Sequence, residues 1–184
     1  MKSKIGKMFL ALFGLGSVAM MVPTRTFYDF KARTIDGKEF DFHSLKGKKV
    51  LVVNTASKCG FTPQYEQLEA LYKTYGGDKF TIIGFPANNF MRQEPGSNAD
   101  IKEFCTKNYG VTFQMMEKIS VKGDSIHPLY KWLTEKAENG KMDAPVKWNF
   151  QKFMIDENGI LVDVASSKEK PDCDKIVNWL KGVK

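Results

Sequence analysis

The chain has 184 residues, of which 42% are hydrophobic and 27% are charged, so it can bury the core of one globular domain and is neither disordered nor fibrous. Its three cysteines and two histidines lie far apart, which excludes a disulfide-stapled mini-protein and offers no ligand spacing typical of a metal site. The net charge of +7 comes largely from dispersed lysines, so we expect a solvated basic surface and no nucleic-acid partner.

The N-terminus predicts an export signal. Three lysines among the first seven residues precede an apolar run over residues 8–22, in which small residues stand at Ser17 and Ala19. This order is typical of a secretory signal, and the run is shorter than the ~20 residues that a spanning helix needs. We expect residues 1–21 to be a cleaved signal peptide or an uncleaved anchor. Residues 22–184 would then form an exported domain, periplasmic or otherwise extracytoplasmic, that stays tethered to the membrane if the leader is retained.

The predicted domain begins with a hairpin and a buried strand. Residues 27–35 and 38–42 are β-like runs joined by Asp36-Gly37, which is a hairpin signal. Residues 49–54 form an unbroken apolar run, typical of a strand that is buried on both faces of a parallel sheet.

A turn and an amphipathic helix follow this strand. Thr62 is the expected N-cap of the helix, Pro63 its first residue, and Gly76 marks its end. Residues 80–85 then predict a second buried strand. Asn98 is expected to cap the next helix, whose apolar side carries Ile101, Phe104 and Cys105.

The last third of the chain adds a strand, a helix, a hairpin and a helix. These elements are a third strand at 115–121, a helix opened by Pro128, a hairpin of 150–155 with 160–164, and a last helix around Ile176. Alternating strands and helices imply right-handed crossovers and a parallel centre, to which the hairpins add antiparallel strands. We therefore predict a thioredoxin-like α/β fold: a central mixed sheet, helices on both faces and an N-terminal β-hairpin.

Cys59 is the candidate reactive residue. It lies between the first buried strand and the following helix, where backbone N–H groups and the positive end of the helix dipole favour a thiolate. Lys58 adds a neighbouring positive charge, and the thiolate is the reactive form of cysteine. Thr62 stands where a C-x-x-C pair would have its second thiol, so dithiol exchange lacks its partner. A lone activated thiol can still attack an oxidant and become a sulfenic acid.

Three segments resemble the signature blocks of the glutathione peroxidase family. They are NTASKCGFT at residues 54–62, GFPANNF at 84–90 and WNF at 148–150, and the wider similarity runs from Phe27 to the end of the chain. The PQYE and QEPG sequences that follow the first two blocks are similar to bacterial members. Three blocks in order are far more specific than one short motif. The resemblance implies a thioredoxin fold and the reduction of hydroperoxides.

The resemblance also implies the catalytic residues. Cys59 takes the position of the peroxidatic residue, and Asn89, Trp148 and Asn149 take the positions of a Gln, a Trp and an Asn that surround it in the family. Indole and amide N–H groups can stabilise a thiolate and the charge on the leaving oxygen. Asn89 departs from the family's glutamine, because it keeps the amide but is one methylene shorter.

Cys105 is the candidate resolving cysteine, because family members that use thioredoxin often carry a cysteine near this point. It also lies on the apolar side of its predicted helix, so a buried core thiol is the alternative interpretation. Resolution would require local unwinding of that helix, since bridged cysteines have Cα atoms within about 7 Å of each other. Cys173, near the start of the last helix, is interpreted as a packing residue and is the second candidate.

We therefore expect a thiol peroxidase of the oxidative-stress response that reduces hydrogen peroxide and organic hydroperoxides through Cys59. Thioredoxin or a similar thiol donor, with glutathione as the other option, would re-reduce it without a cofactor. Residues 138–145 are short where tetrameric, glutathione-using animal members carry a longer loop, so the resemblance implies a monomer. Two alternatives remain. The missing C-x-x-C pair speaks against an exported thiol–disulfide oxidoreductase, and the intact set of Cys59, Trp148 and Asn149 speaks against a non-catalytic binding module.

Overall fold

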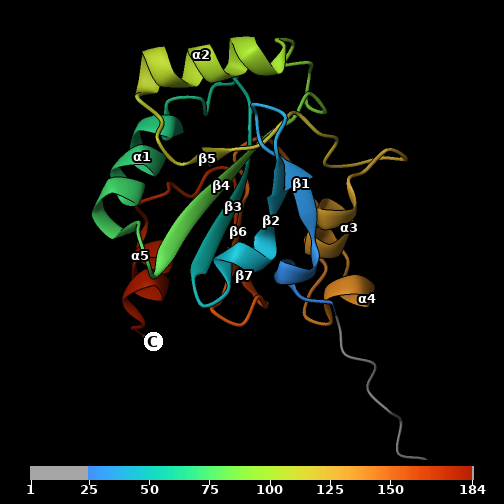
Figure 1. Cartoon of the computed structure of the whole chain (residues 1–184), viewed down its shortest axis with the longest axis vertical. Helices are drawn as coiled ribbons and strands as arrows, with labels where there is room; N and C mark the ends of the chain where they lie inside the picture. The colour runs from blue at the N-terminus through green and yellow to red at the C-terminus, as the bar shows by residue number, and fades with distance from the viewer. Residues whose placement is uncertain (1–24, 184) are drawn as a thin grey trace, which may run out of the picture.

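A computed structural model describes residues 25–183, and Figure 1 shows their helices on both sides of a central sheet. The sheet has the strand order β5-β4-β3-β6-β7, with β3 at Lys49–Thr55, β4 at Phe80–Pro86, β5 at Gln114–Met115, β6 at Lys152–Ile155 and β7 at Leu161–Ala165. The helices are α1 at Gln64–Tyr75, α2 at Asn98–Tyr109, α3 at Pro128–Thr134, α4 at Lys136–Asn139 and α5 at Asp174–Lys181. Strands β3, β4 and β5 run parallel, whereas β6 and β7 are antiparallel to their neighbours. The predicted thioredoxin-like α/β fold is confirmed.

The centre of the sheet is buried on both faces, as its apolar sequence predicts. Along β3, Val50 and Val52 join the core that α3 covers, whereas Leu51 and Val53 join the core of α1, α2 and α5. Successive side chains of a strand point to opposite faces, so an unbroken apolar run is stable only where both faces are covered. This burial fixes the end of β3, where the candidate site begins.

The N-terminal hairpin is shorter than predicted and does not join the central sheet. Its strands β1 (Lys31–Arg33) and β2 (Glu39–Asp41) form a separate two-stranded sheet, linked to the region after β5 by a bridge between Thr34 and Met116. Residues 27–29, predicted as strand, form a 3-10 helix. Thr26 and Asp29 exchange capping hydrogen bonds there, and the Phe27 ring is buried.

The third predicted strand, 115–121, is largely absent. Only Gln114–Met115 pairs regularly with β4. After it, the chain bonds alternately to two different neighbours: Met116 donates to Gly84, Glu117 to Arg33 and Ile119 to Pro86. A segment divided between two neighbours in this way forms no continuous ladder, although its alternating apolar pattern is that of a strand.

Helix starts were predicted to within one or two residues. Pro128 opens α3 as expected, but Ser97 caps α2 in place of Asn98. The Ser97 hydroxyl accepts from the Asp100 backbone N–H, and the Asp100 carboxylate accepts from the Ser97 N–H, which forms a capping box. The short helix α4 was not predicted. The expected leader at residues 1–21 lies outside the described residues, and no helix within 25–183 is long and apolar enough to span a membrane.

Lys152, the first residue of β6, is a fully buried charged side chain. Its Nζ donates to the side-chain oxygen of Gln64 at 2.6 Å and to the backbone oxygens of Glu169 and Ser166 at 2.5 and 3.4 Å. These three acceptors satisfy the ammonium but carry no full negative charge. Burial lowers the pKa of Lys152 from 10.5 to about 8.

We expect the free energy of unfolding to rise by about 1 kcal/mol between pH 8 and pH 9 because of Lys152. Folding lowers its pKa, so in this window the unfolded chain binds more protons than the folded chain and stability increases with pH. Urea titrations at pH 7, 8 and 9 measure the slope, and Lys152→Met should lack this contribution. If the free energy of unfolding changes with pH equally in the wild type and in Lys152→Met, the predicted contribution of Lys152 is wrong. Burial raises the pKa of Cys105 from 9.0 to about 11. Above pH 9 this residue therefore lowers the free energy of unfolding as the pH rises.

Candidate active site

Cys59 lies in a tight turn between β3 and α1, and the turn is held by Thr62. The Thr62 hydroxyl accepts from the Cys59 backbone N–H at 3.0 Å and donates to the Ala56 carbonyl at 2.9 Å. Thr62 was predicted as the helix N-cap, but Pro63 occupies that position and the hydroxyl turns back to the cysteine. Thr62, which stands where a C-x-x-C pair would have its second cysteine, therefore holds the turn that carries Cys59.

The Cys59 sulfur is buried and receives a backbone hydrogen bond. The Phe61 N–H donates to Cys59 Sγ at 3.4 Å, and the side chain is only 7% exposed. The first turn of α1, from Gln64, follows directly, so the positive end of its dipole faces the same turn. Lys58 beside it is exposed. A backbone N–H group that donates to the sulfur and a helix N-terminus beside it are features of reactive cysteines in enzymes.

Asn54 joins the predicted residues Trp148 and Asn149 to β3. Its Nδ2 donates to the Trp148 carbonyl at 3.0 Å, and its own carbonyl accepts from Phe150 N at 2.6 Å. Phe150 has a φ of +63°, a left-handed conformation that costs energy in a residue other than glycine. This turn delays the start of β6 to Lys152, where the sequence predicted a strand from residue 150. It also sets Trp148 and Asn149 beside the end of β3.

Trp148 and Asn149 connect to the Cys59 turn through the loop that follows β4. The Trp148 ring packs on Phe90 with centroids 5.4 Å apart, and Asn149 Nδ2 donates to Gln93 Oε1 at 2.9 Å. The Gln93 carbonyl in turn accepts from Lys58 N at 3.0 Å. Trp148 and Asn149, which are far from Cys59 in sequence, are thus connected to the Cys59 turn through one loop.

The third predicted partner of Cys59, Asn89, turns toward a different part of the chain. Its Nδ2 donates to Ser120 Oγ at 2.9 Å and to the Lys122 carbonyl at 3.4 Å, and its Oδ1 accepts from Val121 N at 2.9 Å. Within residues 25–183, all hydrogen bonds of this carboxamide go to the 120–122 loop. Its catalytic role therefore stays a prediction, and the contact that it makes is with that loop.

Cys105 faces the core from α2, and Cys173 precedes α5. Cys105 is 1% exposed, and burial raises the pKa of its thiol to about 11 despite the neighbouring Tyr65 hydroxyl. Cys59 and Cys105 belong to the same core cluster, but both are free thiols. Cys173 is the N-cap of α5 and is half-buried. The apolar side predicted for α2 is confirmed, because Ile101 and Cys105 are its buried residues.

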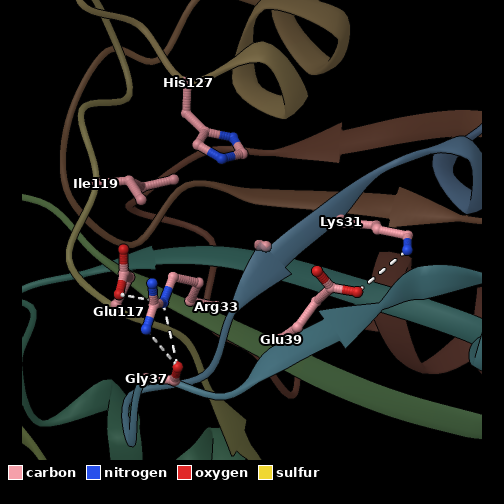
Figure 2. Close-up of a pocket in the computed structure, with 8 residues that line it drawn as sticks. Lys31, Arg33, Gly37, Glu39, Glu117, Ile119 and His127 are labelled. Atoms are coloured by element: carbon pink, nitrogen blue, oxygen red, sulfur yellow. Dashed lines mark hydrogen bonds and ion pairs between the residues drawn. The ribbon is translucent and has the colours of Figure 1, made fainter.

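A groove of about 510 Å³ lies between the N-terminal hairpin and the 117–127 segment and contains none of the predicted site residues. Figure 2 shows Lys31 paired with Glu39, and Arg33 reaching both Glu117 and the Gly37 carbonyl. The ion pairs join exposed or partly exposed side chains, and such pairs contribute little energy. The charged groups of the groove are therefore neutralised by one another.

Sequence reasoning missed Asn54 and Gln93 as members of the site. Asn54 is fully buried at the end of an otherwise apolar strand run, and a polar residue in that position was the available signal. Gln93 carried no such signal, because its role depends on Asn149, 56 positions along the chain. Both residues act through hydrogen bonds that form only once the strands are paired.

Comparison with known proteins finds relatives that match most of the chain. The family profile described as glutathione peroxidase matches residues 27–134. The chain is 51% identical to the glutathione peroxidase-like peroxiredoxin gpx1 of Schizosaccharomyces pombe, over 79% of this chain and 92% of that protein. It is 50% identical to the glutathione peroxidase homolog BsaA of Bacillus subtilis, over 78% and 90%. It is 47% identical to the hydroperoxy fatty acid reductase gpx1 of Synechocystis, over 80% and 90%.

Solved structures show the same fold. The crystal structure of Trgpx in its apo form superposes with a TM-score of 0.66 at 41% identity, covering 85% of this chain and 97% of that one. A thiol:disulfide interchange protein from Chlorobium tepidum superposes with a TM-score of 0.55 at 24% identity, covering 86% and 97%. At that level of identity the second likeness shows the fold alone.

Proposed function

The chain belongs to the glutathione peroxidase family and is a thiol peroxidase, and from this premise we propose that Cys59 is the residue that attacks the hydroperoxide. The observation that carries the proposal is the environment of its sulfur. Cys59 Sγ accepts a hydrogen bond from Phe61 N, and the residue lies just before the start of α1 and is 7% exposed.

The proposed reaction conserves atoms and electrons in three steps. The Cys59 thiolate attacks one peroxide oxygen, the O–O bond breaks, and the second oxygen leaves with a proton as water or an alcohol. Cys59 is now a sulfenic acid. The Cys105 thiol then attacks the Cys59 sulfur, a disulfide forms and water leaves. An external dithiol of the thioredoxin type finally reduces the disulfide and is itself oxidised.

Three features support an external dithiol as the reductant. Cys105 supplies a second thiol on α2, which lies against the same core as Cys59. The relatives from yeast carry the name peroxiredoxin. The segment around Ala144 is short and closes back on α3, because Ala144 N donates to the Thr134 carbonyl. We take this short segment to favour a monomer that lacks a dedicated glutathione site.

Thiol counting after peroxide addition tests the proposed function. The reduced protein should lose the Cys59 thiol within seconds of mixing with hydrogen peroxide and form a dimedone-reactive sulfenic acid when Cys105 is replaced. A thiol–disulfide oxidoreductase or a binding module would keep its thiols on that timescale. Unchanged thiol content would therefore overturn the proposal.

Trp148→Phe should slow the reaction of Cys59 with peroxide by about 10-fold or more, as for the loss of one transition-state donor. The substitution removes the indole N–H but keeps most of the packing on Phe90. Stopped-flow measurement of the second-order rate constant checks it. Trp179→Phe, a tryptophan that packs on Phe80 at the other end of the sheet, is the matched control. A wild-type rate in Trp148→Phe would show that the indole serves only packing.

We further propose that the protein is exported, with residues 1–21 as its leader and 22–184 as its single domain. The basic and apolar order of the first residues supports this proposal. Expression of a chain without residues 1–19 should give a folded, active protein, since the core of the described residues begins at Phe27. Mass spectrometry of the full chain after expression distinguishes a cleaved leader from a retained anchor. An inactive or aggregated truncated protein would contradict the proposed boundary.

A further inference from the structure

The Asn149 carboxamide is fully buried and has one hydrogen-bond partner. Its Nδ2 donates to Gln93 Oε1 at 2.9 Å, while its Oδ1 has no partner within residues 25–183. Buried amides usually satisfy both ends, and an amide with a single hydrogen bond is oriented by that bond. If Gln93 is removed, nothing among these contacts fixes which way Asn149 points.

Gln93 also touches the turn that carries Cys59. Its carbonyl accepts from Lys58 N at 3.0 Å, and its own N–H donates to the Phe90 carbonyl at 3.1 Å. The Phe90 ring packs on Trp148. The loop after β4 thus makes three contacts. The Gln93 carbonyl bonds the Cys59 turn, the Gln93 side chain bonds Asn149, and the Phe90 ring packs on Trp148.

The backbone of this loop adopts an energetically unfavourable conformation at two residues. Met91 and Arg92 are consecutive residues with φ values of +49° and +53°, a left-handed conformation that few residues other than glycine adopt. Both side chains are exposed, with Met91 at 77%, so packing does not explain the conformation. The bend instead returns the chain inward, so that the Gln93 side chain reaches Asn149. The next residue, Glu94, anchors it, with its N–H donating to Asn88 Oδ1 at 2.9 Å.

We propose that Gln93 is a positioning residue that orients the Asn149 amide in the Cys59 site. The proposal rests on the proposed role of Cys59 as the nucleophile. Asn89, the carboxamide expected from the family pattern, uses its hydrogen bonds on the 120–122 loop. Gln93 is the carboxamide that the structure links to both Asn149 and the Cys59 turn.

Two substitutions of Gln93 separate positioning from simple packing. Gln93→Leu keeps the bulk but removes the acceptor, and should lower the rate constant for peroxide attack by about 10-fold or more at every pH, as for loss of a transition-state donor. Gln93→Glu keeps an acceptor for Asn149 but adds a negative charge to the loop that bonds the Cys59 turn. It should shift the pH profile of the reaction to higher pH while keeping the plateau within about 3-fold of the wild type.

A double-mutant cycle tests the connection to Asn149. If Gln93 acts through Asn149, Gln93→Leu should add little to the defect of Asn149→Ala, so the combined loss should be far smaller than the product of the two separate losses. Gln114→Leu is the matched control, because it removes a half-buried amide that, within residues 25–183, donates only to the Met115 carbonyl. Its attack rate should equal that of the wild type.

The outcomes distinguish this inference from the proposed function. If Cys59→Ser still consumes peroxide, the proposed function fails. If Cys59→Ser is inactive while Gln93→Leu reacts at the wild-type rate with an unchanged pH profile, the role of Gln93 is overturned and Cys59 keeps its role. The role of Gln93 is also overturned if the rate loss of the double variant equals the product of the losses in Gln93→Leu and Asn149→Ala. If Gln93→Leu does not fold, Gln93→Glu and its pH profile decide between the same outcomes.

Discussion

Cys59→Ser should abolish peroxide turnover and leave the fold intact. A serine hydroxyl is not ionised near neutral pH and does not attack a peroxide, whereas the thiolate does. The turn should survive, because it is held by the Thr62 hydroxyl and by backbone hydrogen bonds that a serine at position 59 retains. Activity should fall to the uncatalysed background, measured as peroxide consumption coupled to thioredoxin and thioredoxin reductase.

The controls for this result are the fold and a second cysteine. Circular dichroism and the unfolding midpoint of Cys59→Ser should match the wild type. Cys173→Ser, the same substitution at the half-buried N-cap of α5, should react with peroxide at the wild-type rate in the first step. Turnover that survives in Cys59→Ser would show that the chemistry lies elsewhere in the chain.

The fold was predictable where burial alone decides the structure. The apolar runs of β3 and β4 are typical of strands covered on both faces, and their parallel pairing follows from the intervening helix. The pairing of the N-terminal hairpin was not predictable in the same way. Its strands alternate between exposed and half-buried residues, a pattern that suits a separate two-stranded sheet as well as an edge of the central one.

The site was predictable as a set of residue types but not in its contacts. Position in the motifs predicted Cys59, Trp148 and Asn149, and in the structure the loop after β4 contacts Trp148, Asn149 and the backbone of the Cys59 turn. The direction of a carboxamide depends on which partners the fold brings within about 3 Å, and no local pattern encodes it. Asn89 shows this, since its partners are Ser120, Val121 and Lys122, more than 30 positions away.

Cys105→Ser should leave the first reaction with peroxide intact but reduce thioredoxin-linked turnover to near zero. Cys59 alone attacks the peroxide, so its second-order rate constant should not change. Without Cys105 the sulfenic acid has no internal thiol to condense with and should over-oxidise to sulfinic acid at high peroxide. Mass spectrometry of Cys59 and the coupled thioredoxin assay measure the two effects. In the wild type, peptide mapping after peroxide treatment should find a Cys59–Cys105 disulfide.

The proposed resolving step would involve a local opening of α2. Cys105 is 1% exposed and burial raises the pKa of its thiol to about 11, so we expect the helix to open when Cys105 reacts with the sulfenic acid. Helix α2 can open at modest cost, because Ile101 and Cys105 are its buried residues and the others are exposed or half-buried. The capping box at Ser97 holds the start of the helix, whereas Gly110 ends it in a left-handed turn.

Hydrogen exchange should therefore report the opening. On oxidation, the amides of Asn98–Tyr109 should lose protection, most of all in the half of α2 around Cys105, whereas those of α1 should keep theirs. Unchanged protection in α2 together with a mapped disulfide would mean that the Cys59 turn moves and α2 does not. If Cys105→Ser retains full thioredoxin-linked turnover, Cys105 is a core residue, and Cys173, half-buried at the N-cap of α5, becomes the next residue to replace in the same test.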